Sequence, residues 1–204
     1  MTPQSSTRWV GPVSLFAATL IIASQGLHFA LGLTMGAQPS DNVLHSVKYA
    51  FALIATIALV FALTGLYLRQ ADAAGRLGLV GYVVAFIGTV LMAGDWWFES
   101  FIAPQIAAVA PQVMTGAITG SMVVGAVATF VLFALGWTIF GIATFRANVY
   151  PRPAAALMII GGLIGILALS TPYQIPLAIA IGWIGYSLMQ SERAGAFAQA
   201  PTAA

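Results

Sequence analysis

Apolar residues fill six long stretches of the chain, and polar residues are confined almost entirely to the gaps between them. The stretches cover residues 13–35, 47–68, 77–98, 117–144, 154–170 and 174–190. A helix needs about 20 apolar residues to cross the hydrocarbon core of a bilayer. The pattern therefore predicts an all-α fold, an integral membrane bundle of about six transmembrane helices. A tight inner loop that contains Asp72, Gly75 and Arg76 is expected between the second stretch and the third.

The composition agrees with a membrane protein and leaves no stretch for a soluble domain. Hydrophobic residues make up 60% of the 204 residues and charged residues 6%, which excludes an ordinary soluble protein. We expect one transmembrane domain, residues 13–190, between a short N-terminal tail, residues 1–12, and a disordered tail, residues 191–204. The first stretch is too long for a signal peptide, so we expect it to be retained. The chain has no cysteine, which excludes disulfides and thiolate metal sites.

The arginines are sorted among the gaps. All six lie in gaps that a chain of six antiparallel helices brings to one side: Arg8, Arg69, Arg76, Arg146, Arg152 and Arg193. Lysine and arginine collect in cytoplasmic loops, so we expect both termini in the cytoplasm and a multi-pass protein of the cell (inner) membrane. We expect the arginines to set this orientation and to do nothing more. The net charge of +2 then reports topology and not binding to nucleic acid.

Smaller features predict details of the bundle. Pro104 and Pro111 break residues 100–116, which suit an outer loop with a surface-lying or re-entrant turn better than a span. Glycines at helical spacing, such as Gly161 and Gly162, predict close packing of helices within one bundle, with a dimer interface as the alternative. Threonine hydroxyls inside spans commonly bond back to their own helix, as we expect for Thr56, Thr64, Thr129 and Thr138.

One short segment gathers carboxylates and aromatic rings in a chain that has few charges. It is residues 94–99, Gly-Asp-Trp-Trp-Phe-Glu. Asp95 and Glu99 are four residues apart, so a helix presents both carboxylates on one face. At a rise of about 1.5 Å per residue they reach the outer membrane interface. Either Trp96, Trp97 and Phe98 form an aromatic belt beside hydrated carboxylates, or the segment belongs to a functional site.

His28 is the second candidate, because it lies below the outer end of the first stretch, with Gln25 about one turn earlier. An ionisable group at such a depth usually faces the bundle interior or a water-filled cavity. A neutral histidine bonded to a carbonyl or hydroxyl is the alternative interpretation. His45 and Lys48 begin the second stretch and Tyr173 lies in the last hairpin, all on the same outer side. Lys48 can either neutralise a carboxylate or hold an anionic head group.

Three chemical uses of these residues stay open. A divalent metal such as zinc or iron can be held by His28, His45, Asp95 and Glu99, but their spacing matches no metal motif, so we name no cofactor. A carboxyl of Asp95 or Glu99 can act as a general acid or base on a lipid or isoprenoid, assisted by His28 or His45. An outward-facing pocket with aromatic and polar walls can bind a lipid, quinone, isoprenoid or pigment.

Binding of a hydrophobic or amphiphilic small molecule, in a pocket formed by the first three stretches, is the function that we predict first. The predicted ligand-binding residues are Trp96, Trp97, Phe98, His45, Lys48, Gln25 and Tyr173. The alternative is a membrane-embedded enzyme with Asp95, Glu99 and His28 as catalytic residues. A third hypothesis is a structural subunit of a larger membrane complex, docked through the aromatic segment.

Membrane lipid, a hydrophobic small molecule, and a second copy or a membrane complex are the expected partners; nucleic acid is not among them. The small six-span chain, its Gly-Asp-Trp-Trp-Phe-Glu segment and the Arg-Pro pair in an inner loop resemble those of bacterial integral membrane proteins. This general resemblance implies a bacterial membrane location and no particular activity.

Overall fold

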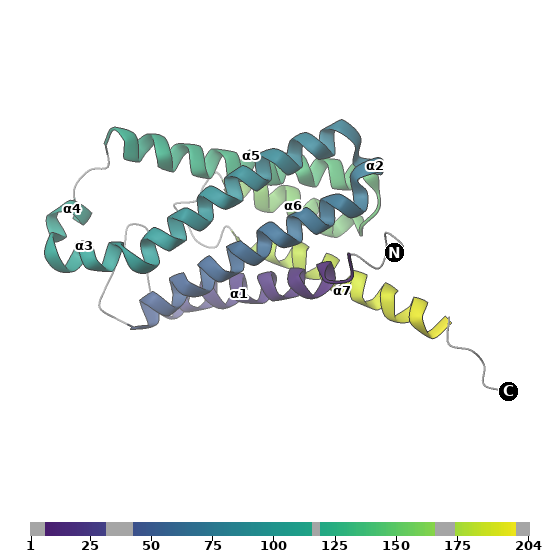
Figure 1. The fold of residues 1–204 in the computed structure, drawn as a ribbon, viewed down its shortest axis with the longest axis horizontal. Coiled ribbons are helices and arrows are strands. Elements are labelled where there is room, and N and C mark those ends of the chain that lie inside the picture. The colour runs from purple at the N-terminus through teal and green to yellow at the C-terminus, as the bar shows by residue number, and fades with distance from the viewer. Residues whose placement is uncertain (1–6, 32–42, 116–118, 166–173, 199–204) are drawn as a thin grey trace.

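The computed structural model describes residues 7–31, 43–115, 119–165 and 174–198, and the regular elements in these ranges are all helices. They are α1 (Val10–Ala30), α2 (Val43–Phe101), α3 (Ala103–Val109), α4 (Pro111–Thr115), α5 (Ser121–Ala147), α6 (Arg152–Gly165) and α7 (Ile175–Ala198). Figure 1 shows the long helices side by side, with the start of α1 and the end of α7 at one end of the bundle. Three of them, α1, α2 and α5, are long and apolar enough to cross a membrane. The all-α prediction is confirmed for the described residues, and the lengths of these helices support a membrane protein.

Helix α2 consists of two arms that meet at a sharp bend (Figure 1). The bend is at Gly75, whose φ of 55° and ψ of −148° are not helical. Residues with a side chain rarely adopt such a positive φ, so glycine suits this position. The rings of Tyr67 and Tyr82 stack at 4.4 Å, which shows that the two arms lie side by side. The predicted loop at residues 72–76 is therefore shorter than expected, because the helix continues through Asp72 and only Gly75 departs from it.

The second arm of α2 packs on α5 with backbone against backbone. A side chain at Gly81 would meet the backbone of Phe140, and one at Gly136 would meet the backbone of Ala85. In a bilayer, where no hydrophobic force drives helices together, such close approach strengthens van der Waals packing. Glycines further along the same two helices, Gly94 and Gly125, would meet nothing within 4 Å. The tight crossing is thus confined to one part of the α2–α5 interface.

The glycines singled out in the sequence lie in seams of the same kind. A Cβ on Gly161 would lie 2.7 Å from the backbone nitrogen of Leu177 in α7. A Cβ on Gly162 would meet the backbone nitrogen of Thr138 in α5 at a similarly short distance. Gly185 of α7 faces the carbonyl oxygen of Gly11 in α1. These contacts confirm that the glycines pack helices within one bundle.

The threonines inside the helices satisfy themselves, as predicted. Each hydroxyl donates to the carbonyl four residues earlier: Thr56 to Ala52, Thr64 to Val60, Thr129 to Gly125, and Thr138 to Ala134, at 2.7–2.9 Å. Such bonds remove a hydroxyl from the set of groups that can line a polar path.

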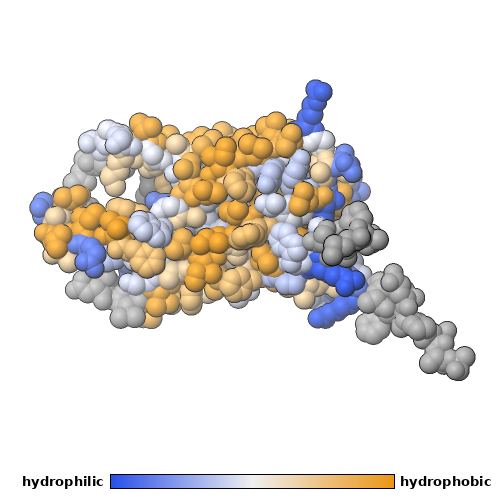
Figure 2. Space-filling view, in the orientation of Figure 1, coloured by the Kyte–Doolittle hydropathy of each residue, from blue (hydrophilic) through white to orange (hydrophobic). Residues whose placement is uncertain are grey.

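The middle of the bundle is apolar. Its largest fully buried side chains include Trp137, Phe133, Phe140, Leu59, Leu63 and Leu66. The indole nitrogen of Trp137 donates to the hydroxyl of Thr89 at 3.1 Å, so this buried donor has a partner. Figure 2 shows apolar residues over the middle of the surface and hydrophilic residues gathered at the end where α1 begins and α7 ends.

Two boundaries differ from those expected. Helix α7 continues to Ala198, so residues 191–198 are helical and not part of a disordered tail. Helix α1 begins at Val10, so the expected tail of residues 1–12 overlaps the first helix. The extension of α7 follows from residues that favour a helix but are polar or small, which a hydropathy pattern does not count. In α1, Pro12 lies in the first turn, where a proline is tolerated. The prolines act as expected: Pro104 lies in the first turn of α3, and Pro111 begins α4.

Candidate functional site

The end of α1, the beginning of the first arm of α2 and the end of its second arm lie at the end of the bundle far from the Gly75 bend (Figure 1). Several polar and ionisable side chains belong to these three helix ends. We call this group the histidine cluster. Its members are Gln25 and His28 of α1, His45, Lys48 and Tyr49 of the first arm of α2, and Asp95, Trp96 and Glu99 of the second arm. The sequence predicts all of these residues for a site except Tyr49.

Side-chain hydrogen bonds hold α1 against its neighbours at this end. The Ser24 hydroxyl donates to the backbone carbonyl of Lys48 at 3.0 Å, which joins α1 to the beginning of α2. The Gln25 amide nitrogen donates to Oε1 of Gln174, just before α7, at 3.4 Å. Both bonds are buried, so they fix the neighbouring side chains of the cluster in place.

His45 is the most deeply buried ionisable side chain of the cluster, with 1% of its surface exposed. Its ring packs edge-on against Tyr49 at 4.8 Å. Neither Nδ1 nor Nε2 has a hydrogen-bond partner among the described residues. A buried polar group without a partner costs about 1–3 kcal/mol, so a structure that keeps one calls for an explanation.

Lys48 is also buried, and its ammonium lies 3.9 Å from the centre of the Tyr49 ring. A cation over an aromatic face gains electrostatic attraction, and the gain increases when water is excluded. The Tyr49 ring also contacts the Trp96 ring, with the ring centroids 5.7 Å apart. The aromatic rings thus connect the two arms of α2, and Lys48 forms part of this connection.

Asp95 and Glu99 lie half-buried on the second arm. Electrostatic interactions join the ionisable groups in series: His28 with His45, His45 with Lys48, Lys48 with Glu99, and Glu99 with Asp95. These interactions require the groups to be near one another, because water screens charges that lie apart at the surface. The fold therefore brings together both histidines, the lysine and both carboxylates. The sequence predicts only that these residues lie on the same side of the membrane.

The aromatic segment divides between the interior and the surface. Trp96 packs against the hydrophobic core and Tyr49, and its Nε1 is buried without a partner in the described part of the chain. Trp97 is 51% exposed and contacts Phe101 at 5.9 Å. Phe98 is half-buried. The three aromatic residues are therefore not one docking edge, and Tyr173, the remaining predicted ligand residue, lies outside the described residues.

A metal centre receives no support from the geometry. Within the described ranges, no three or more His, Asp or Glu side chains are grouped so that they could hold a metal ion. The His28 ring contacts Phe29 edge-on at 6.1 Å, and it is half-buried. The cluster is thus a series of neighbouring polar groups and not a convergent set of ligands.

At the opposite end, which we call the arginine end, polar groups hold one another. Arg69 donates to the hydroxyl and the carbonyl oxygen of Thr7 at 3.0 and 3.1 Å and forms an ion pair with Glu192. The Tyr150 hydroxyl donates to the carbonyl of Leu66 at 3.0 Å, and burial raises the pKa of this hydroxyl. The expectation that the arginines only set orientation is therefore wrong for Arg69, which ties the start of the chain, α2 and α7 together. No spacing in the sequence indicates these pairings.

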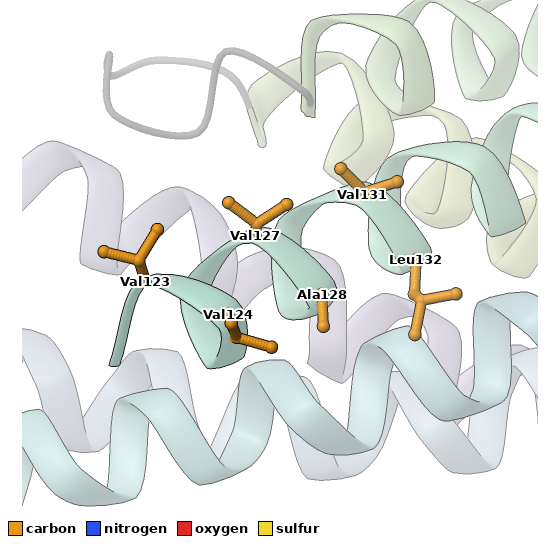
Figure 3. Close-up of a pocket in the computed structure, with 6 residues that line it drawn as sticks. All are labelled: Val123, Val124, Val127, Ala128, Val131 and Leu132. Carbon is orange, nitrogen blue, oxygen red and sulfur yellow. The ribbon is translucent and has the colours of Figure 1, made fainter. Parts of the chain in front are cut away.

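A groove of about 500 Å³ runs along the N-terminal half of α5 (Figure 3). The described residues that line it are all apolar: Val123, Val124, Val127, Ala128, Val131 and Leu132. In Figure 3, Val123 and Val127 point to one side of α5 and Leu132 points to the other. No member of the histidine cluster is among these residues, so this groove is not the polar pocket that the sequence predicts.

The histidine cluster contains side chains that can donate and accept hydrogen bonds. No protein-family model matches the chain, and neither a curated protein nor a solved structure matches it. Interpretation of the site therefore depends on its geometry alone.

Proposed function

We propose that this chain is a multi-pass membrane protein whose histidine cluster binds the polar head of a small hydrophobic or amphiphilic molecule. In this proposal α1, both arms of α2, α5, α6 and α7 cross the membrane, and both termini are cytoplasmic. All six arginines lie near helix ends or near the α2 bend, at the arginine end of the bundle. Because arginine collects in cytoplasmic loops, this supports a cytoplasmic location for that end. Helix α6 alone is short, since its 14 residues extend only about 21 Å.

The observation that carries the proposal is His45. A ring with 1% exposure and no hydrogen bond to either nitrogen from the described residues destabilises the fold unless something else bonds to it. Near the same end, Gln25 Oε1 and Trp96 Nε1 are buried and have no partner in the described ranges. A bound polar head supplies the missing bonds to several of these atoms at once, which is why we assign a binding function.

The apolar middle of the bundle favours binding over transport. Between the two ends lie Leu59, Leu63 and Leu66 of α2 and Trp137 and Phe140 of α5, all fully or almost fully buried. The threonine hydroxyls at this depth bond to their own helices. A carrier needs polar groups along its path, so a ligand held at the histidine cluster fits these residues better than a substrate that crosses the bundle.

The proposal is tested by what is purified with the protein. The protein is expressed, purified in mild detergent, and its bound molecules are identified by native mass spectrometry and lipid extraction. We expect one kind of hydrophobic molecule at a ratio of about one per protein. In His45→Phe and in Lys48→Met this ratio should fall at least fivefold. Phe101→Leu, a change at an exposed aromatic residue at the end of α2, is the control and should keep the molecule. Equal lipid content in all four proteins would contradict the proposal.

A membrane-embedded enzyme is the second candidate, and the proximity of Asp95 and Glu99 favours it. Two neighbouring half-buried carboxyls can hold different protonation states, as general acid–base chemistry requires. The variants Asp95→Asn and Glu99→Gln separate the two functions. If the molecule found with the wild-type protein is a reaction product, these variants should retain its precursor instead.

A further inference from the structure

We infer that the head group bound by the histidine cluster is uncharged and carries oxygen atoms, as a quinone carbonyl or an alcohol does. This inference rests on the proposed function, because it names the chemical class of the ligand of the same site. It follows from two properties of the cluster: the kind of hydrogen bond that its buried atoms lack, and the sum of its charges.

The buried atoms without partners define what the head group must offer. Trp96 Nε1 can only donate a hydrogen bond, and a neutral imidazole donates one and accepts one. Gln25 Oε1 can only accept. An oxygen atom in the ligand satisfies Trp96 and the donor nitrogen of His45, and a hydroxyl can also donate to the acceptors. A hydrocarbon head satisfies none of these atoms.

Two of these residues lie close enough for one small head group. His45 and Trp96 both contact Tyr49, at centroid distances of 4.8 and 5.7 Å. A small head beside Tyr49 can therefore reach atoms of both arms of α2.

The charges of the cluster disfavour a charged head group of either sign. In their neutral forms His28 and His45 add no charge. Lys48 is the one cation and Asp95 and Glu99 are two anions, which leaves an excess of one negative charge that repels an anionic head. A cationic head is disfavoured because the Lys48 ammonium already covers the face of Tyr49, where an aromatic site would hold a cation.

The test uses four probes with the same ten-carbon tail. They are 2-decyl-1,4-benzoquinone, decanol, decanoate and decylamine, and their binding to the full chain in nanodiscs at pH 7.5 is measured by equilibrium dialysis against empty nanodiscs. We expect the two uncharged probes to bind at least about tenfold more tightly than the charged probes. His45→Phe and Trp96→Phe should weaken the uncharged probes at least fivefold, and Phe101→Leu, at an exposed residue of the second arm, should not change them.

A second variant at His45 separates lost hydrogen bonds from lost folding. His45→Gln keeps a donor and an acceptor, so it should bind the uncharged probes more tightly than His45→Phe does; equal binding by the two, with both folded by circular dichroism and gel filtration, would overturn the inference. Binding of decanoate or decylamine as tight as that of the quinone would overturn the head-group inference and leave the proposed function standing. Failure of all four probes, together with no molecule purified from cells, would overturn both.

Discussion

The two ends of the helix bundle differ in whether their buried polar side chains are hydrogen-bonded. At the arginine end, Arg69 bonds to Thr7 and Glu192, and Tyr150 bonds to the carbonyl of Leu66. At the histidine cluster, both nitrogens of His45 and the indole nitrogen of Trp96 lack partners among the described residues. The first arrangement stabilises the fold by itself, and the second leaves hydrogen-bonding capacity for another molecule.

The contrast has two exceptions. At the arginine end Gln70 Nε2 donates to the Thr144 hydroxyl at 2.8 Å, but Gln70 Oε1 has no partner in the described part of the chain, and neither has the buried Ser14 Oγ near the start of α1. Isolated buried atoms of this kind occur in folded proteins. The histidine cluster differs because several such atoms lie together, beside a buried lysine and two carboxylates. Proteins often retain destabilising groups of this kind where function needs them.

The largest expected effect is on stability and comes from the α2–α5 interface, where Gly136 meets Ala85. Gly136→Val places a branched side chain against the backbone of Ala85, and we expect it to lower the free energy of unfolding by about 3 kcal/mol or more. Gly125→Ala, on the same helix at a position where an added Cβ meets nothing within 4 Å, is the control and should raise stability by about 0.5–1 kcal/mol. Unfolding by SDS titration in mixed micelles measures both. Equal stability of the two variants would mean that α2 and α5 do not meet at this seam.

The next effect breaks the bonds of the arginine end. Arg69→Met removes the hydrogen bonds to Thr7 and leaves Glu192 without its partner, and we expect stability to fall by about 2 kcal/mol. Arg193→Met removes the same charge from an exposed position and should change stability by less than about 0.5 kcal/mol. Thermal unfolding of both purified variants decides this point. If they unfold at the same temperature, Arg69 acts only through its charge, as the sequence suggests.

Tyr150 gives a pH dependence to the same end. Tyr150→Phe removes the bond to Leu66 and should cost about 1 kcal/mol at neutral pH. Burial raises the pKa of this hydroxyl above that of an unfolded tyrosine, which is about 10. A raised pKa in the folded state contributes stability below pH 10, and this contribution is lost as the pH rises further. The stability difference between the wild-type protein and Tyr150→Phe should therefore shrink above pH 10, and a constant difference up to pH 11.5 would contradict a buried hydroxyl.

The smallest effect has the opposite sign and tests the histidine cluster. His45→Phe removes two buried atoms without partners and keeps a flat ring, so ligand-free protein should become more stable by up to about 1 kcal/mol. The same variant should bind the proposed ligand at least fivefold more weakly. Thermal unfolding after delipidation measures the first quantity. A loss of 1 kcal/mol or more would show that the nitrogens of His45 are already bonded and that the two ends do not differ.

Much of the helical content could be predicted from the hydropathy pattern, because each helix needs only its own residues to form. The threonine bonds were predictable for the same reason, since donor and acceptor are four residues apart on one helix. The division between Trp96 and Trp97 was not predictable. Neighbouring residues on a helix point about 100° apart, and only the position of Tyr49 on the other arm decides which of them is inside.

The sequence by itself determined that apolar helices alternate with short polar gaps, and that the arginines gather on one side and both histidines and three of the five carboxylates on the other. These features are local, and they depend on composition and spacing. Only the tertiary structure decided which polar groups are paired, as Arg69 is, and which are buried without partners, as His45 is. The physical reason is that lipid-facing and protein-facing sides of an apolar helix have similar compositions, so close glycine contacts such as Gly136 against Ala85 set the helix rotations that bring distant side chains together.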